Sequence, residues 1–362
     1  MNLKSINPAT RKLINEYETY SEQKINLILE DVSIDFSFWK GLSFNKRKDF
    51  LLSVSNKLKS EINIHSKMIS IEMGKPITES KLEVLKSVWV LEYYAQNAEK
   101  FLKNELIDSD FSESFIQYDP IGIVFGIMPW NFPYWQVFRF IAPSLMAGNV
   151  CILKHASNVS GCALLIEKLI KECCPYPNIF RTLIISSSQV PGVISNNKVK
   201  AVTLTGSEYA GSQVAMKAGK EIKKTVLELG GSDCFIVLED ADVEKAAKTA
   251  VAARFLNTGQ SCIAAKRFLI HDKIHDTFVA KVEILIKNLN MGNPLLDETQ
   301  IGPLAKIEFV DEIDRLVQSS IKKGAKCILG GKKNDSYYYP TLLINIDERM
   351  DVFNYETFGP VF

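Results

Sequence analysis

The sequence predicts an α/β fold of two domains, at least one of them built around a parallel sheet. Its 362 residues exceed the size at which a single hydrophobic core usually stops growing. A composition of 46% hydrophobic and 23% charged residues is typical of a globular protein. In the middle of the chain, short β-branched or aliphatic runs alternate with helical patterns, which is typical of right-handed βαβ units.

Helices are expected ahead of this sheet. Apolar residues recur at helical spacing from Phe44 to Phe101, among many Lys and Glu residues. Gly74-Lys75-Pro76 breaks the stretch, which predicts two packing helices. Residues 112–118 then alternate like a strand before Pro120. The chain is therefore expected to enter the sheet after this proline.

Five short runs are the predicted strands of the sheet. They cover residues 122–127, 150–153, 181–185, 199–204 and 224–229. Helical patterns over 162–173 and 211–217 separate several of them. Parallel sheets bind ligands at the carboxyl ends of their strands, so the motifs that directly follow these runs are the candidate site residues.

A second series of elements follows a double glycine. A strand is expected over 234–238, then a helix that Asp240 or Asp242 caps and that reaches Phe255, then a strand over 267–270. We place the domain boundary near Gly230, because the paired glycines leave the chain free to cross between domains.

Bulk properties exclude several classes of protein. The formal net charge is +1 with Lys and Arg dispersed, which gives no broad attraction to nucleic acid or to an anionic membrane. No apolar run approaches the length of a membrane span, and the first ten residues lack the apolar core of a signal peptide. The seven cysteines are scattered without C-x-x-C spacing, so we expect neither a disulfide framework nor a zinc site, and a cytoplasmic location.

Two histidines form the one pattern that could indicate a metal. His271 and His275 are four residues apart and would share a helix face, which is half of a zinc site. No glutamate stands between them and no third ligand is near. We expect a solvated helix start and no metal.

A thiol and a carboxylate are the candidate catalytic pair. Glu228 precedes Leu229-Gly230-Gly231, and Cys262 follows Gly259-Gln260-Ser261. A thiolate is a strong nucleophile, and a nearby carboxylate can take a proton from the thiol or from water. Taken singly, the cysteine could be a small buried hydrophobe and the glutamate a paired structural group.

Several motifs occur together with this pair. They are Met128-Pro129-Trp130-Asn131-Phe132-Pro133, Lys154-His155-Ala156, Thr205-Gly206-Ser207 and Glu356-Thr357-Phe358-Gly359-Pro360. In order and spacing, across nearly the whole chain, they resemble the aldehyde dehydrogenase superfamily. The resemblance implies a Rossmann-type dinucleotide-binding domain over 1–229, with an oligomerisation hairpin near 105–120, and a second α/β catalytic domain over 230–362.

The resemblance also bears on assembly. Similar chains usually continue past the position of Phe362 with a portion that completes the catalytic domain and supplies an oligomerisation strand. We therefore expect a catalytic domain that is short at its C-terminus. A homodimer or homotetramer is expected if that strand is present.

The resemblance implies roles for three catalytic residues. Cys262 would attack an aldehyde carbon, and the thiohemiacetal would donate a hydride to NAD(P) and become a thioester. The Asn131 amide and the Cys262 backbone N–H would stabilise the oxyanion. Glu228 would activate the water that releases a carboxylic acid. Without the resemblance, the preferred interpretation is that Asn131 caps a helix beginning near Pro133.

The implied cofactor site gathers after several strands. Its residues are Ile127, Pro129, Trp130, Lys154, Ala156, Ser157, Gly206, Ser207, Leu229, Gly230, Glu356 and Phe358. Gly206-Ser207 is expected to open a helix whose N-terminus meets the pyrophosphate. NAD-selecting relatives commonly have glutamate at the position of Ser157, where it would repel a 2′-phosphate. Serine here predicts NADP, with NAD possible.

Arg139 is the main clue to the substrate. Asn131, Trp135 and Arg139 are four residues apart, and we expect them to point the same way. A guanidinium can bind a substrate carboxylate through two hydrogen bonds, although it could instead pair with a structural acid. Together with Trp135-Gln136-Val137-Phe138-Arg139 and Lys154-His155-Ala156-Ser157-Asn158-Val159, this pattern is similar to succinate-semialdehyde dehydrogenases. The resemblance implies a four-carbon semialdehyde, succinate semialdehyde, as substrate, with Ser261 as a further contact.

Other functions remain open at this point. The enzyme could act on another short aldehyde. The chain could also be an idle binding or scaffold relative, or a thiol esterase that uses Cys262 and Glu228 without hydride transfer.

Overall fold

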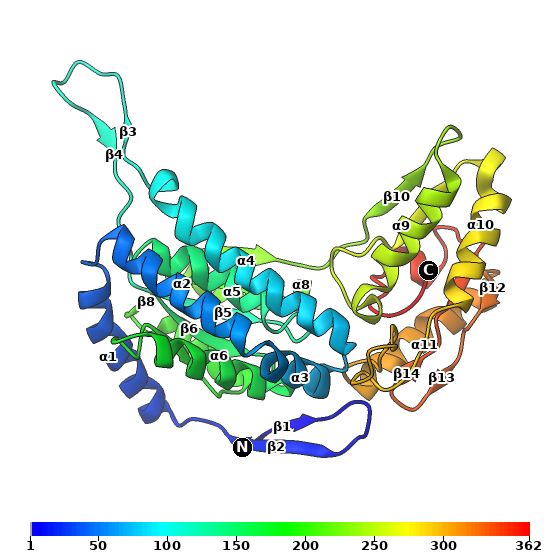
Figure 1. The fold of residues 1–362 in the computed structure, drawn as a ribbon, viewed down its shortest axis with the longest axis horizontal. Coiled ribbons are helices and arrows are strands. Elements are labelled where there is room, and N and C mark those ends of the chain that lie inside the picture. The colour runs from blue at the N-terminus through cyan, green and yellow to red at the C-terminus, as the bar shows by residue number, and fades with distance from the viewer. Residues whose placement is uncertain (1) are drawn as a thin grey trace. The chain divides into compact units, whose positions relative to one another are not determined.

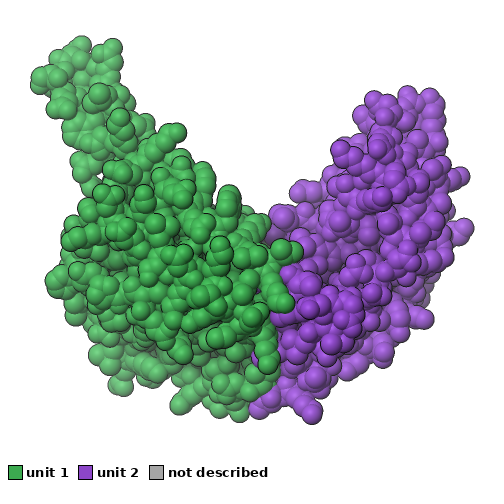
Figure 2. All heavy atoms as spheres, viewed as in Figure 1, with its two compact units in different colours: residues 1–5, 14–68, 81–228 green, residues 6–13, 69–80, 229–362 purple. Residues whose placement is uncertain are grey.

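The computed structural model describes residues 2–362 (Figure 1). Figure 2 shows that the chain forms two compact units. Among the described residues, unit 1 contains 2–5, 14–68 and 81–228, and unit 2 contains 6–13, 69–80 and 229–362. The assignment of 1–229 to dinucleotide binding and of 230–362 to catalysis stays a prediction, because compactness alone does not identify a ligand.

Unit 1 is built around a five-stranded parallel sheet. The strand order is β7-β6-β5-β8-β9, and every neighbouring pair is parallel. The strands are β5 (Ile123–Met128), β6 (Val150–His155), β7 (Phe180–Thr182), β8 (Val199–Thr205) and β9 (Lys224–Glu228). All five predicted runs are confirmed as strands, although the third is shorter than expected.

Helices connect these strands as βαβ units. Helix α5 (Trp135–Met146) packs on β5 and β6, α6 (Ser160–Cys173) on β6 and β7, and α8 (Glu208–Lys220) on β8 and β9. Short helical segments follow β6 and β7, namely η1 (Ser157–Val159), η2 (Ser187–Gln189) and α7 (Val190–Ser195). Gly126 lets α5 approach the sheet, because a Cβ there would lie 2.5 Å from the Phe140 ring.

The helical N-terminal region differs from expectation in one detail. The predicted pair of helices is three: α2 (Phe44–Ser60), α3 (Ile62–Met73) and α4 (Ile77–Phe101). Gly74 provides the expected break, with φ of 82°. The other break falls at Glu61, with φ −99° and ψ 18°, where no glycine or proline signals it.

The first forty residues carry elements that the sequence patterns did not reveal. A hairpin of β1 (Asn2–Ile6) and β2 (Leu13–Glu18) precedes α1 (Glu22–Trp39). The Ser21 hydroxyl caps α1 by accepting from the Lys24 N–H. In the 105–120 region, β3 (Glu105–Leu106) and β4 (Phe115–Ile116) form a short exposed hairpin. Its role in oligomerisation stays a prediction.

Helix α5 begins near Pro133, as expected, but its cap is not Asn131. Its first residue is Trp135, two residues after Pro133. The Glu83 carboxylate accepts hydrogen bonds from the Tyr134 and Trp135 N–H groups at 2.8 and 3.0 Å, and so caps the helix from another element. The expectation that Asn131 might cap this helix is therefore wrong.

Unit 2 contains smaller sheets and three longer helices. Strand β10 (Cys234–Val237) pairs in parallel with β11 (Arg267–Ile270), and β12 (Lys326–Leu329) pairs antiparallel with β15 (Leu342–Ile344). Strands β13 (Lys333–Asn334) and β14 (Tyr337–Tyr338) form a hairpin. The helices are α9 (Val243–Phe255), α10 (Asp272–Lys287), α11 (Ile307–Lys322) and the short α12 (Asp351–Asn354), and η3 (Leu256–Gly259) follows α9.

The predicted cap of α9 is confirmed, whereas the predicted arrangement of the two histidines near α10 is wrong. Asp242 caps α9, accepting from the Lys245 N–H at 3.1 Å. His271 is the cap of α10 and accepts from the Lys273 N–H, whereas His275 lies within the helix. These two histidines therefore do not share a helix face, because the helix starts after the first of them.

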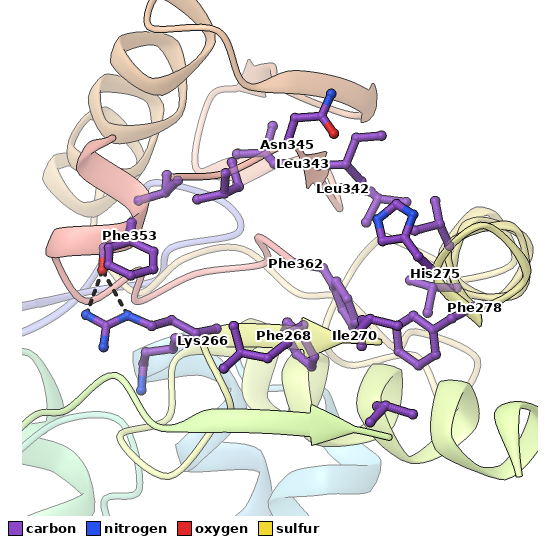
Figure 3. Close-up of a pocket in the computed structure, with 18 of the residues that line it drawn as sticks. Lys266, Phe268, Ile270, His275, Phe278, Leu342, Leu343, Asn345, Phe353 and Phe362 are labelled. Atoms are coloured by element: carbon purple, nitrogen blue, oxygen red, sulfur yellow. Dashed lines mark hydrogen bonds between the residues drawn. The ribbon is translucent and has the colours of Figure 1, made fainter. Parts of the chain in front are cut away.

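An apolar groove of about 550 Å³ lies between β11 and β15 (Figure 3). Phe268, Phe278 and Leu342 are among its lining residues. The main chain of Val361 and Phe362 runs parallel to the start of β15, with the Leu343 N–H donating to the Phe362 carbonyl at 2.9 Å. The Phe362 ring stacks on Phe268 with 3.7 Å between centroids.

Over residues 2–362, none of the helices combines the length and apolar character that crossing a bilayer requires.

Candidate active site

The carboxyl ends of four parallel strands meet at one edge of the unit 1 sheet. Ile127 at the end of β5 pairs with Lys154 on β6 and with Leu204 on β8. Thr205 at the end of β8 pairs with Glu228 at the end of β9. The chain leaves β5 toward β6 on one side and returns to β8 on the other, so this edge is a topological switch point, where such sheets bind ligands.

The predicted cofactor residues of unit 1 lie at this edge. Pro129 and Trp130 follow β5, Ala156 and Ser157 follow β6, and Gly206 follows β8. Ser157 is half-buried and begins η1. The structure thus brings together the predicted ribose and phosphate contacts that belong to this unit.

The N-terminus of α8 is formed as expected, with one feature that the sequence reading did not weigh. Ser207 caps the helix, its hydroxyl accepting from the Ala210 N–H at 3.3 Å. The N-terminal end of a helix attracts anions. Glu208 places a carboxylate in the first turn, where it opposes a second negative charge.

His155 braces the loop that carries Asn131. Its ring is buried, with Nε2 2.9 Å from the Pro133 carbonyl and Nδ1 3.0 Å from the Ala156 nitrogen. Nδ1 also lies 3.1 Å from the Met128 carbonyl oxygen, which accepts the Ala156 N–H at 3.0 Å, so a neutral ring donates to one of two carbonyls, that of Pro133 or that of Met128. Burial lowers the pKa of His155 to about 4, so the ring is neutral at physiological pH. No signal in the sequence marks this histidine beyond its place in the Lys154-His155-Ala156 motif.

Asn131 lies in that braced loop, after β5 and before α5. Its side chain is 4% exposed. Trp135, the first residue of α5, lies under the Lys86 ammonium at 4.1 Å from the ring centroid. Trp135 and Arg139 share a helix face as expected, whereas Asn131 precedes the helix and is placed by the loop rather than by helical spacing.

Arg139 and Glu228 lie close to each other. The Arg139 Nη1 is 3.6 Å from a Glu228 carboxylate oxygen, and Nη2 is 3.4 Å from the Thr205 hydroxyl, which accepts the hydrogen bond. Both side chains are partly exposed, so water weakens the ion pair. The acid that pairs with Arg139 is thus the predicted base, at the same strand edge.

Cys262 follows a tight turn in unit 2. Asn257, Thr258 and Gly259 have φ between 55° and 75°, a left-handed conformation that is costly for the first two. Gly259 is required, because a Cβ there would lie 2.2 Å from the Gly359 carbonyl oxygen. The Gln260 side chain accepts from the Ala305 N–H at 3.0 Å. The turn leaves Ser261 buried and Cys262, a free cysteine, half-buried.

Two buried cations tie this turn to the segment that carries Glu356 and Phe358. The Lys266 ammonium donates to the carbonyls of Ser261, Cys262 and Ala264, the segment called the nucleophile turn after the predicted role of Cys262. It lies 2.9 Å from the Glu356 carboxylate. The Arg254 guanidinium donates to the Thr357 and Gly359 carbonyls, both at 2.7 Å. Burial lowers the pKa of Arg254 to about 10, so it remains a cation at neutral pH.

Gly230 lies against the same segment. A Cβ at this position would come within 2.2 Å of a Glu356 carboxylate oxygen. Leu229 and Gly230 therefore join Ser261, Cys262, Glu356 and Phe358 as the predicted site residues of unit 2. The remaining predicted residues belong to unit 1. The sequence reading missed Lys266 and Arg254, because charged residues within an amphipathic pattern usually indicate surface.

Residues 2–362 contain no group of three or more His, Cys, Asp or Glu side chains that could hold a metal ion.

Comparison with known proteins places these residues in context. The sequence pattern of the aldehyde dehydrogenase family matches residues 1–362. A probable succinate-semialdehyde dehydrogenase [NADP(+)] of Synechocystis sp. is 42% identical over 364 residues, covering 100% of this chain and 80% of the relative. A succinate-semialdehyde dehydrogenase [NADP(+)] of Mycobacterium avium is also 42% identical, over 368 residues, with 100% and 78% covered.

The fold is equally similar to a solved structure. The crystal structure of succinic semialdehyde dehydrogenase from Streptococcus pyogenes in complex with NADP+ superimposes with a TM-score of 0.96 and 31% sequence identity. It covers 99% of this chain and 80% of that chain.

His155 predicts a component of the pH dependence of stability. Its folded pKa is below the unfolded value of 6.5, so the folded state loses stability as pH falls from about 6.5 toward 4, by roughly 3 kcal/mol in total. Chemical unfolding of wild type and His155→Gln at several pH values should show this component only in the wild type. His275→Gln, a change at a partly exposed histidine, is the matched control and should leave the dependence intact. An equal dependence in His155→Gln would contradict the assignment.

Proposed function

Since the chain belongs to the aldehyde dehydrogenase family, we propose that it oxidises succinate semialdehyde to succinate with NADP as hydride acceptor. The observation that carries the substrate assignment is Arg139. Its guanidinium lies at the strand edge beside the proposed base, is partly exposed, and makes an ion pair of 3.6 Å with Glu228 and a hydrogen bond of 3.4 Å to Thr205. The guanidinium can instead donate two short hydrogen bonds to a substrate carboxylate.

The residues at the strand edge fit NADP. Lys154 supplies a cation, Ser157 supplies a hydroxyl, and residues 154–157 include no carboxylate. A 2′-phosphate carries nearly two negative charges and requires such surroundings. The chemistry that NADP supplies when bound is acceptance of a hydride from the sulfur-bound carbon. Glu356 and Phe358, in unit 2, are proposed to hold the nicotinamide ribose.

Cys262 begins the reaction by attacking the aldehyde carbon through its thiolate. The Asn131 amide and the Cys262 backbone N–H donate to the oxygen as it becomes negatively charged. When this oxyanion collapses, the carbon gives up a hydride and a thioester remains. Glu228 then accepts a proton from water, the resulting hydroxide attacks the thioester carbon, and the carbon–sulfur bond breaks. Succinate leaves and Cys262 is regenerated.

Arg139 would link substrate recognition to this last step. In the structure its guanidinium contacts the Glu228 carboxylate, which must be free to accept a proton from water. A substrate carboxylate competes for the same guanidinium. Binding of an acidic aldehyde would therefore both orient the substrate and release the base, whereas a neutral aldehyde would do neither.

The first prediction concerns the reaction itself. Purified protein given succinate semialdehyde and NADP should form reduced nicotinamide, measured by its absorbance, and Cys262→Ala should abolish it because no thiohemiacetal can form. Cys234→Ala, at an exposed cysteine of the same unit, should retain activity. Turnover by Cys262→Ala would contradict the mechanism. Cleavage of a nitrophenyl ester without nicotinamide reduction would favour a thiol esterase.

A second prediction concerns Arg139. Arg139→Ala should raise KM for succinate semialdehyde by about ten- to a hundredfold, because charged hydrogen bonds to the carboxylate are lost. KM for propanal should change little, and initial-rate kinetics with both aldehydes measures the difference. Arg349→Ala, which removes an exposed arginine paired with Asp347, serves as the control. An unchanged preference for the acidic aldehyde would refute the role of Arg139.

A third prediction concerns the choice of nicotinamide. Ser157→Glu should weaken NADP binding by at least about tenfold and shift preference toward NAD, because the carboxylate repels the 2′-phosphate. Binding titrations with both nucleotides measure the ratio. Ser37→Glu adds the same charge at an exposed position of α1 in unit 1 and should not change it. An NADP affinity unaffected by Ser157→Glu would place the 2′-phosphate away from this residue.

A further inference from the structure

Lys266 lies beneath the nucleophile turn with an unusual set of partners. Its side chain is 1% exposed, and its ammonium donates to the carbonyls of Ser261, Cys262 and Ala264 at 3.1, 2.9 and 3.2 Å. The Glu356 carboxylate is 2.9 Å from the same nitrogen. A buried lysine therefore contacts both the nucleophile's own peptide group and the segment proposed to hold the cofactor ribose.

The number of N–H groups on the ammonium decides which of these contacts are hydrogen bonds. A lysine ammonium has three N–H donors, and three carbonyls are present to accept them. Glu356 therefore balances the charge without taking a directed hydrogen bond, which agrees with the absence of a hydrogen-bond donor to its Oε1 among residues 2–362. The carbonyls fix the position of the ammonium, and the carboxylate makes its burial tolerable.

Holding these carbonyls also aims the backbone N–H groups. In a trans peptide, the C=O of one residue and the N–H of the next point in opposite directions. The Ser261 carbonyl accepts from the buried ammonium, so the Cys262 N–H points away from that ammonium. Cys262 is half-buried and the next residue, Ile263, is 74% exposed. Over residues 2–362, this N–H donates to no backbone acceptor.

The position of Glu356 is constrained in turn. Gly230 leaves space that its carboxylate occupies, since a Cβ there would lie 2.2 Å from Oε2. The adjoining residues Thr357 and Gly359 are held by the Arg254 guanidinium, which donates a hydrogen bond to the carbonyl of each. The carboxylate, the ammonium and the turn thus form one connected arrangement inside unit 2.

We propose that Lys266 is a positioning residue for chemistry at Cys262: its ammonium orients the Ser261, Cys262 and Ala264 carbonyls so that the Cys262 N–H serves as an oxyanion donor, and Glu356 holds the ammonium in place. The inference rests on the proposed function, because it deepens the role of the Cys262 backbone. Lys266 touches no reacting atom. It acts through the direction of a peptide group.

The test compares two reactions of the same thiol. Acyl transfer from a nitrophenyl ester passes through an oxyanion, whereas alkylation by iodoacetamide does not. In Lys266→Met, kcat for ester cleavage and for dehydrogenation should fall by about a hundredfold, the typical effect of losing one oxyanion donor. Alkylation of the Cys262 peptide, followed by mass spectrometry, should proceed at the wild-type rate. Lys266→Arg should recover part of the loss, because it restores the charge and donors.

Three further measurements separate positioning from folding. Lys333→Met removes an exposed lysine of the same unit, and it should leave all three reactions unchanged. Asn131→Ala should lower the rate of ester cleavage strongly when Lys266 is present but only weakly when it is combined with Lys266→Met. The two effects are not additive, because the Asn131 amide and the Cys262 N–H act together on one oxyanion. Hydrogen exchange over residues 256–266 should accelerate in Lys266→Met alone.

Each result has a definite meaning. Equal loss of ester cleavage and alkylation in Lys266→Met would indicate general disruption and overturn the inference, as would full ester activity in that variant. Ester cleavage that depends on Lys266 in a protein with no dehydrogenation would sustain the inference while the proposed function fails. If wild type cleaves no ester and oxidises no aldehyde, unchanged hydrogen exchange in Lys266→Met overturns the inference, and faster exchange confined to 256–266 sustains it.

Discussion

Parallel pairing of β5 with both β6 and β8 is the constraint on which the candidate site depends. It brings the ends of strands that are far apart in sequence to one edge, with Ile127 opposite Lys154 on one side and Leu204 on the other. A register shift of one residue would turn these side chains to the opposite face. The β-branched and aliphatic runs of β5, β6 and β8 therefore also fix where Ser157 and Gly206 lie.

Unit 2 differs from unit 1 in that two buried cations, Lys266 and Arg254, hold its part of the candidate site. Placing Lys266 and Arg254 inside the unit costs desolvation free energy, and a hydrophobic replacement would often be at least as stable. Backbone carbonyls recover part of this cost, because they satisfy the buried donors of both cations. The arrangement is difficult to explain as a source of stability alone. It holds a turn with left-handed Asn257 and Thr258 in a single conformation, which active sites commonly require.

Much of the fold was predictable from local pattern. The five strands of the sheet and the Asp242 cap follow from periodicity and capping chemistry, which act over a few residues. The α2–α3 break was not predictable, because no glycine or proline marks Glu61. The capping group of α5 was not predictable, because it is the carboxylate of Glu83, far away in sequence. Such long-range hydrogen bonds leave no local signal.

The candidate site divides along the same line. Cys262, Glu228 and the strand-end motifs could be named from the sequence, because their residue types and spacing carry the chemistry. The supporting residues could not. In the sequence, His155 is only one residue of a motif and Lys266 resembles a surface lysine. Their roles become visible only from the groups that they contact in the fold. The ion pair between Arg139 and Glu228 likewise joins two residues that the sequence had assigned separate roles.

The groove between β11 and β15 has a consequence for the protein in solution. Within residues 2–362, strand β11 pairs with β10 along one edge, and the apolar side chains around Phe268 lie in the groove between β11 and β15. An edge strand beside apolar side chains is a place where an extended segment of polypeptide can pair as a further strand and cover them.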